Sequence, residues 1–215
     1  MNTEPTSTAN WRGLITLTLV ALITASLLSW VASITREPIE QQRQAAITAA
    51  LSQVIPDIAF DNALPQSRRP LAAQGFFQTE QPLYVYSAHH GDQTVALIFD
   101  VVTSRGYNGT IRLLIGVAAD GRVSGIQVTE HRETPGLGDA IDPDKSDWLQ
   151  QFSGVRRNQP AADQWRPGVG FDALSGATIT ATAVIDLVQR TLRYFAENRE
   201  QLLALHHPAD DDGNP

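Results

Sequence analysis

An uncharged segment of 22 residues near the start of the chain, Gly13–Ile34, constrains the fold more than any other feature of the sequence. As a helix it would be about 33 Å long at ~1.5 Å per residue, close to the roughly 30 Å hydrocarbon core of a bilayer. A cleaved signal peptide usually has a shorter apolar region of about 7–15 residues, and a buried core helix of this length would be unusual without a polar face. Trp11 and Trp30 lie near its two ends, where indole rings favour the headgroup region. We therefore predict a retained transmembrane helix.

Charge and residue composition exclude several classes of function. The chain has 16 Lys plus Arg, 23 Asp plus Glu and a net charge of −7, and its basic residues form no stripe that would bind nucleic acid. The absence of cysteine excludes disulfides, cysteine-ligated metals and thiolate catalysis. The five histidines have no metal-ligand spacing, so we expect no metal site. Basic residues flank both ends of the apolar segment almost equally, so charge does not determine its orientation in a membrane.

Changes in composition divide the chain into five regions. The juxtamembrane segment can begin a helix at Thr35, with Pro38 in its first turn, and continue to Pro56. The following "DNALPQSRRP" (61–70) is rich in turn residues, which indicates a connector. We predict an N-terminal tail (1–12), a transmembrane helix (13–34), a juxtamembrane helix and connector (35–70), a globular domain (71–205) and a disordered acidic tail (206–215).

The globular region contains alternating apolar segments that are typical of strands. They cover residues 83–88, 94–103, 110–118 and 122–131. The Asp120-Gly121 pair between the last two is a strong hairpin signal. The connections are too short for the crossovers that parallel neighbours require, so we predict an antiparallel meander. Two helical segments follow, a short one within 144–152 and a long one from Thr178 to about Leu205, which makes the predicted class α+β, an antiparallel sheet with flanking helices.

The start of the long helix is preceded by an unusual cluster of hydroxyl residues, "LSGATITAT" (174–182). The cluster consists of Ser175, Thr178, Thr180 and Thr182 around Gly176. A helix N-terminus needs only one capping hydroxyl, although capping is the simplest interpretation of such residues. The unpaired N–H groups of a first helical turn and the helix dipole favour an anion such as phosphate. A hydroxyl here can therefore cap the helix, donate to a phosphate oxygen or form a phosphate ester.

Three segments resemble a known family. "DALSGATIT" (172–180) resembles the flavinylation motif of the FMN-binding domain found in the G subunit of Rnf/Rsx-type ion-translocating electron-transport complexes and in the C subunit of sodium-translocating NADH:quinone reductases. "GYNGTI" (106–111) and "HRETPGLG" (131–138) resemble the family's turn before a core strand and its loop against the flavin ring. The order, spacing, length and single N-terminal anchor resemble the Rnf/Rsx G subunit over nearly the whole chain. The reductase's C subunit, which is usually longer, is the second choice.

The resemblance implies a covalent cofactor, FMN, joined through its phosphate to Thr180 by a flavin transferase that uses FAD. It implies no catalytic residue, and we interpret Asp172 as a recognition residue for the transferase. The further cofactor-binding residues implied are Asp172, Ser175, Gly176, Ala177, Thr178, Glu133, Thr134, Pro135, Gly136, Leu137 and Gly138.

The resemblance also implies a role in a larger complex of the translocase class. Such a protein relays electrons within a membrane complex that couples electron transfer between ferredoxin and NAD to ion movement. Its partners would be the other membrane and peripheral subunits and, transiently, the transferase. Its globular domain would lie on the periplasmic side of the bacterial inner membrane. The chain lacks a G-x-G-x-x-G nucleotide fingerprint, so we expect no independent turnover. Two other classes remain open: a membrane-tethered binding or assembly module without flavin, and a hydrolase using Ser175, which lacks the G-x-S-x-G elbow.

Overall fold

The computed structural model describes residues 11–204, except for the side chains of Arg12 and residues 31–46. The first ten residues of the predicted N-terminal tail and the predicted C-terminal tail lie outside this part of the chain. Contacts divide the chain into two compact units, Met1–Ala46 and Ile47–Pro215.

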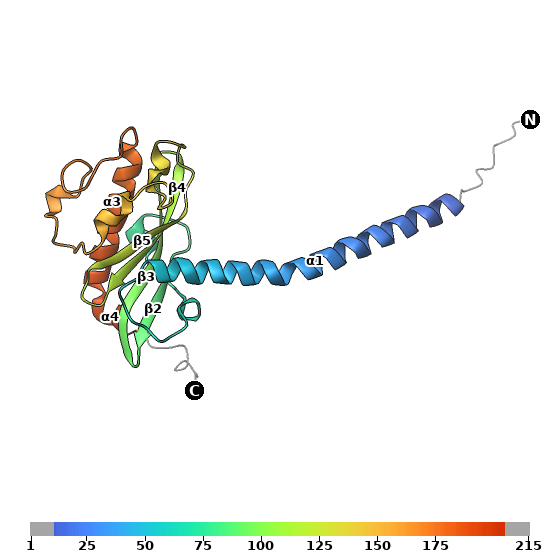
Figure 1. Ribbon diagram of the computed structural model, residues 1–215, viewed down its shortest axis with the longest axis horizontal. Coiled ribbons are helices and arrows are strands. Elements are labelled where there is room, and N and C mark those ends of the chain that lie inside the picture. Colours follow the sequence, from blue (N-terminus) through green and yellow to red (C-terminus); the bar gives the residue numbers. More distant parts are fainter. Residues whose placement is uncertain (1–10, 205–215) are drawn as a thin grey trace, which may run out of the picture. The chain divides into compact units, whose positions relative to one another are not determined.

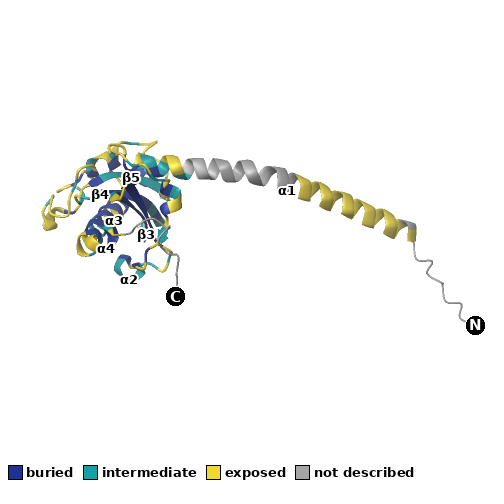
Figure 2. Cartoon of the chain, turned by 90° about the horizontal axis from the view of Figure 1, so that it is seen from below, coloured by how far each residue is buried: buried dark blue, intermediate teal, exposed yellow. Residues whose placement is uncertain are grey.

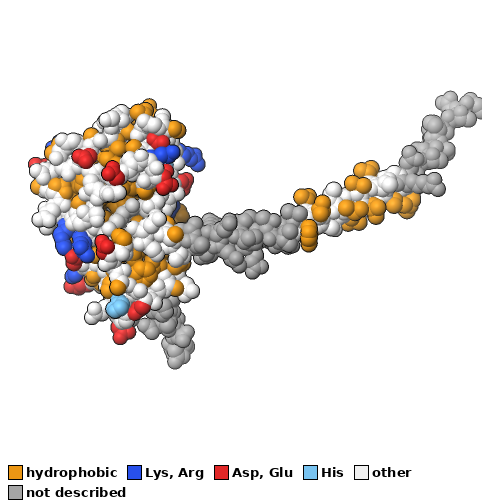
Figure 3. Space-filling view, viewed as in Figure 1, with side chains coloured by type: hydrophobic (Ala, Val, Ile, Leu, Met, Phe, Trp, Pro, Cys, Tyr) orange, Lys and Arg blue, Asp and Glu red, His pale blue; other side chains and the backbone are white. Residues whose placement is uncertain are grey.

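The first unit contains the apolar part of α1, a helix that runs from Trp11 to Gln53. Within it, Gly13–Trp30 is an 18-residue segment long and apolar enough to cross a bilayer, and none of it is buried in the structure. Figure 3 shows hydrophobic and uncharged side chains along this segment. The hydroxyl of Thr24 donates to the carbonyl of Val20 at 2.8 Å, which satisfies a polar group inside the helix itself. The segment is therefore compatible with the predicted single-pass membrane anchor.

The backbone of α1 is continuous across Thr35, where the sequence predicted the start of a second helix. Proline is favoured in the first turn of a helix, so Pro38 indicated the start of a new helix. The residues around it are rich in Glu, Gln and Ala, all good helix formers. Their propensity favours continuation of the helix, and the anchor and the juxtamembrane segment form one element.

The second unit is built on a five-stranded antiparallel sheet whose strands follow one another in chain order (Figure 1). The strands are β1 (Arg69–Pro70), β2 (Tyr84–His90), β3 (Gln93–Gly106), β4 (Gly109–Ala118) and β5 (Val123–Glu130). This arrangement confirms the predicted meander and the α+β class. The predicted connector 61–70 includes the short edge strand β1, whose two residues are too few to produce an alternating pattern.

The sheet has a hydrophobic core on each of its two faces, and Figure 2 shows much of its strands in the dark blue of buried residues. Leu97 and Phe99 of β3 point into the larger core, whereas Ala96 and Ile98 point into the smaller one, because successive strand residues face opposite sides. The larger core is closed by α3 (Thr178–Glu197), which packs on β3 and β4. The smaller core is closed by the end of α1 and the residues after it, Leu51, Val54 and Ile55.

The remaining helices are short and complete the edges of the cores. The long helix predicted from Thr178 ends at Glu197, and a second helix, α4 (Arg199–Leu203), follows after a break at Asn198. The other elements are α2 (Gln74–Phe77) and the 3-10 turns Leu64–Ser67, Gly138–Ile141, Trp148–Phe152 and Ala162–Gln164. The turn at Trp148 lies within the predicted short helix at 144–152.

A pair of glycines allows the chain that leaves α1 to lie directly on the sheet. Gly116 of β4 pairs with Gly125 of β5, and both face the backbone of Val54. A Cβ on Gly116 would overlap the carbonyl oxygen of Val54, and one on Gly125 would lie 3.0 Å from it. The hydroxyl of Ser124 donates to the same oxygen at 2.6 Å. The missing side chains are therefore what permits this close backbone approach.

Gly116→Ala should lower the free energy of unfolding by about 1–3 kcal/mol, because the added methyl group overlaps backbone that is itself packed on the sheet. Gly75→Ala is a matched control, since a Cβ there meets no atom within 4 Å. Urea unfolding of the full-length protein in detergent, followed by tryptophan fluorescence, measures both variants. An unfolding midpoint for Gly116→Ala no lower than that of the control would contradict the contact.

Candidate functional site

A cavity of about 450 Å³ opens where three segments distant in sequence meet. These are the β3–β4 turn, the loop after β5 and the start of α3. In the meander the β3–β4 turn and the end of β5 lie at the same end of the sheet, as the pairing of Arg112 with Glu130 indicates. The lining residues are Tyr107, Glu133, Thr134, Leu137, Gly138, Gly176, Ala177, Thr178, Ile179 and Thr180.

One side-chain hydrogen bond joins the helix to the loop within this cavity. The hydroxyl of Thr180 donates to Oε2 of Glu133, and the two residues are 0% and 5% exposed. The other carboxylate oxygen, Oε1, accepts the backbone N–H of Asn108 at 3.2 Å. Both oxygens of Glu133 are therefore held in defined directions, one toward the turn and one toward the helix.

Two glycines provide the space that this carboxylate occupies. A Cβ on Gly106 would lie 2.6 Å from Oε1 of Glu133. A Cβ on Gly138 would lie 2.8 Å from Oε2 of Glu133 and 3.0 Å from the hydroxyl oxygen of Thr180. Any larger residue at these positions would push the carboxylate away from the helix, so the two glycines are part of the site geometry.

The other hydroxyls before and within α3 have different surroundings. The N-cap residue is Ala177, and no side chain caps the helix. Thr182 donates to the carbonyl of Thr178 at 2.7 Å, whereas Ser175 and Thr178 are exposed. The capping interpretation of the cluster therefore does not hold in the structure. The N–H groups of the first turn have no intrahelical acceptors, which suits an anion at this helix end.

Most of the predicted site residues line the cavity, and four do not. Pro135 and Gly136 belong to the same loop as Glu133 but lie outside the lining. Ser175 is exposed beside it. Asp172 also has an exposed side chain, while its backbone N–H donates to the side-chain oxygen of Gln151 at 2.6 Å and its carbonyl accepts the indole N–H of Trp148 at 2.9 Å. These bonds hold the backbone of Asp172 at the surface.

The structure adds three residues that the sequence did not assign to the site. Tyr107 and Ile179 line the cavity and are 65% and 54% exposed, and with Leu137 at 45% they present apolar surface at its mouth. The side-chain amide of Asn108 donates to the hydroxyl of Thr134 at 3.0 Å and so ties the turn to the loop. The only sequence signal for Tyr107 and Asn108 was the segment 106–111, whose composition is that of a turn.

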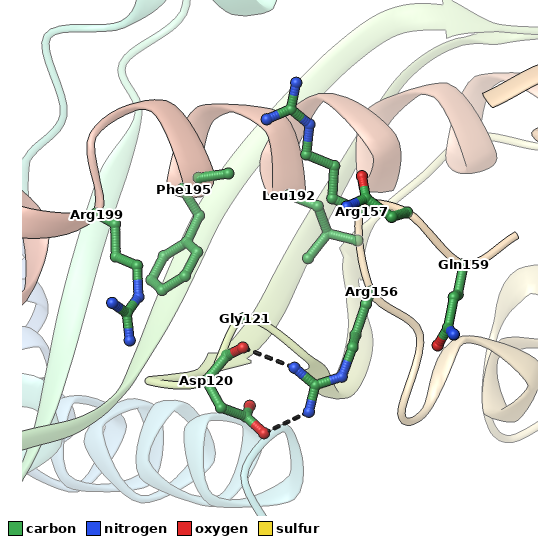
Figure 4. A pocket seen from close by; sticks show the side chains of 10 residues that line it. Asp120, Gly121, Arg156, Arg157, Gln159, Leu192, Phe195 and Arg199 are labelled. Carbon is green, nitrogen blue, oxygen red and sulfur yellow. Dashed lines mark hydrogen bonds and ion pairs between the residues drawn. The ribbon is translucent and has the colours of Figure 1, made fainter. Parts of the chain in front are cut away.

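A second cavity, of about 620 Å³, lies near the C-terminal part of α3 (Figure 4). Figure 4 shows Arg156 turned toward Asp120, where it donates to the backbone carbonyl at 2.7 Å and to the carboxylate at 2.6 Å. Burial favours a higher pKa for Asp120, but hydrogen bonds from the Arg122 backbone and Arg156 hold this pKa below its usual value. Arg199 donates to a backbone carbonyl at 2.8 Å. The lining contains no hydroxyl, imidazole or thiol, so the first cavity is the candidate site.

The chain is similar to a described family over both of its parts. Residues 106–193 match the family described as FMN-binding domain, and residues 7–54 match the RnfG N-terminal region. A relative from Pseudoalteromonas atlantica, named as the G subunit of an ion-translocating oxidoreductase complex, is 36% identical over 191 residues, which cover 87% of this chain and 89% of the relative. Relatives of the same name from Pseudomonas aeruginosa and Vibrio cholerae are 38% and 35% identical, covering 90% of this chain and 92% and 94% of their own lengths.

Thr180→Val should lower the free energy of unfolding by about 1–3 kcal/mol, because the buried Glu133 carboxylate loses a hydrogen-bond donor. Thr180→Ser keeps the hydroxyl and should lose less. Thr178→Val is the control, since Thr178 lies in the same turn but is exposed. Urea unfolding of protein from a host that lacks a flavin transferase compares unmodified chains. Equal midpoints for Thr180→Val and Thr178→Val would contradict a stabilising role for this bond.

Proposed function

The chain belongs to the family of G subunits of ion-translocating oxidoreductase complexes, and on this premise we propose that it carries FMN in phosphoester linkage to Thr180 and relays electrons within such a complex. The observation that carries this proposal is the position of Thr180, which lines a cavity within the matched FMN-binding domain. Ferredoxin and NAD as end partners and coupled ion movement follow from the sequence resemblance described above.

The residues around the cavity fit FMN in chemistry. The first turn of α3 offers backbone N–H groups and the hydroxyl of Thr178 to a phosphate, without requiring a lysine or arginine. The apolar side chains of Tyr107, Leu137 and Ile179 offer surface to a flat aromatic ring. Because Gly138 has no side chain, the loop backbone could approach a bound ring closely. Polar groups for a phosphate and apolar groups for a ring therefore lie within one cavity.

The flavin would supply the redox chemistry, because its isoalloxazine ring accepts one or two electrons. The chain's own residues would hold and orient it. An ester at Thr180 would hold the phosphate end at a buried position of α3, and Leu137 and Gly138 of the loop after β5 would line the space for the ring. A tethered cofactor cannot diffuse away, which suits a carrier that works outside the cytoplasm, where free FMN is scarce. Asp172, exposed beside the site, is available for recognition by the flavin transferase.

The apolar segment of α1 would anchor this carrier in the bacterial inner membrane, with the globular unit on the periplasmic side. The compatibility of Gly13–Trp30 with a membrane span and the names of the relatives support membrane association. The periplasmic orientation follows from the family resemblance alone, because the flanking charges are balanced. The neighbours would be the other membrane and peripheral subunits of the complex.

The flavin attachment predicts an all-or-none difference between threonine variants. The wild-type chain, isolated from cells that contain the transferase, should exceed its sequence mass by FMN less one water and should remain fluorescent after denaturing electrophoresis. Thr180→Ala should show neither property, whereas Thr182→Ala should retain both, because Thr182 is exposed and lies outside the lining of the cavity. An unmodified wild-type chain would instead support a tethered binding or assembly module without flavin.

The orientation predicts a clear labelling pattern, since the chain has no cysteine of its own. Asp92→Cys places a thiol in the exposed β2–β3 turn, and a membrane-impermeant maleimide should label it in intact spheroplasts. Thr3→Cys, on the other side of the apolar segment, should be labelled only after the membrane is permeabilised. The reverse pattern would place the globular unit in the cytoplasm.

A further inference from the structure

We infer that Glu133 prepares Thr180 for flavin attachment: its carboxylate orients the hydroxyl and accepts the hydroxyl proton as the phosphoester forms. This inference rests on the proposed function and assigns a role within it. The sequence resemblance implies Glu133 only as a residue near the flavin ring. In the structure its carboxylate accepts a hydrogen bond from the Thr180 hydroxyl, whose oxygen would become the ester oxygen.

The geometry is that of a nucleophile and its proton acceptor. A hydroxyl becomes a useful nucleophile when a base lies within hydrogen-bond reach and is itself held in place. Oε2 of Glu133 accepts the Thr180 hydroxyl, while Oε1 is held by the backbone N–H of Asn108 at 3.2 Å. The acceptor therefore points at one oxygen and does not have to reorient before the reaction.

This contact distinguishes Thr180 from the neighbouring hydroxyls. Thr182 donates to a backbone carbonyl, which is a poor proton acceptor. Ser175 and Thr178 are exposed, and neither donates to a carboxylate among the described residues. Of the four hydroxyls in this stretch, only that of Thr180 faces a carboxylate in the part of the chain that the structure describes. Glu133 thus offers a physical reason why this threonine would be the one modified.

The described contacts of the Glu133 carboxylate do not include a cation. Over residues 47–204, no lysine or arginine forms an ion pair with Glu133. Its described side-chain partners are a hydroxyl and a backbone N–H, both of which leave the carboxylate able to take up a proton. A carboxylate that only stabilised a loop could do so in an ion pair with a lysine or arginine, and Glu133 forms no such pair among the described residues.

The bonds and the proton balance in a single displacement at phosphorus. The donor is a flavin–adenine dinucleotide, presented by the flavin transferase. The hydroxyl oxygen of Thr180 attacks the phosphorus that bears the riboflavin moiety, and a new O–P bond forms. The bond from this phosphorus to the bridging oxygen breaks, and AMP leaves with the electron pair. The hydroxyl proton passes to Oε2 of Glu133 and from there to solvent, and no atom changes its oxidation state.

The test measures the rate of flavin attachment with full-length protein in detergent, purified transferase and FAD, followed by intact mass and by peptide mapping of Thr180. Glu133→Gln preserves size and the contact with Asn108 but removes the proton acceptor, and it should slow attachment by about 100-fold or more. Glu133→Asp withdraws the carboxylate by one methylene and should react at an intermediate rate. Glu130→Gln, at the exposed end of β5, should react like wild type.

The pH dependence separates proton transfer from a structural role. The wild-type rate divided by the Glu133→Gln rate should decrease as the pH is lowered, because a protonated carboxylate cannot accept the hydroxyl proton. Other charged or titratable groups face this region. His131 Nδ1 accepts the backbone N–H of Glu133 at 3.2 Å, Tyr107 lines the cavity, and Arg105 lines an adjoining cavity while paired with Asp186 at 2.7 Å. His131→Asn should keep the pH dependence, which excludes the imidazole as its source.

The outcomes distinguish this inference from the proposed function. A wild-type chain that acquires no flavin at Thr180 would overturn the proposed function and the inference with it. A modified wild type together with an undiminished rate in Glu133→Gln, or with a rate ratio that does not change with pH, would overturn the role of Glu133 alone. Should Glu133→Gln fail to fold in urea titration, Glu133→Asp decides, and a wild-type rate in that variant would overturn the inference.

Discussion

The packing of α3 against β3 and β4 determines where the functional side chains of the globular unit lie. Thr180, Val184 and Val188 are four residues apart, so they share the face of α3 that is buried against the sheet. Thr178 and Thr182 lie two residues away on either side and are exposed. Helical periodicity therefore selects one threonine of the cluster for burial, and the loop after β5 brings a carboxylate to it. The candidate site is thus a consequence of core packing.

Much of the sheet could be predicted because its signals are local. Alternating apolar residues marked β2 to β5, and Asp120-Gly121 marked the hairpin between β4 and β5. β1 was missed because two residues, one of them a proline, carry no periodicity. The break in the helix at Asn198 was also missed, because the residues on both sides of it favour a helix. The continuity of α1 past Pro38 was missed because the helix propensity of the residues around this proline outweighs its effect.

The site was predictable in part, for the same reason. The motifs at 131–138 and 172–180 identified the loop and the helix start, and the structure brings both to one cavity. No sequence pattern could show that Glu133 contacts Thr180, since the two are 47 residues apart and meet only through the fold. The roles of Asn108 and Tyr107 could not be predicted either, because the contacts of a turn residue depend on which distant segment packs against the turn.

The way α1 ends on the sheet also determines how the globular unit could be separated from its anchor. Leu51, Val54 and Ile55 close the smaller core, and the Gly116–Gly125 pair accommodates their backbone. A soluble fragment that begins after these residues would leave an apolar face of the sheet open to water and prone to self-association. One that begins before Ile47 would keep both layers. The last turn of α1 and the residues that follow it therefore supply part of the hydrophobic core of the globular unit.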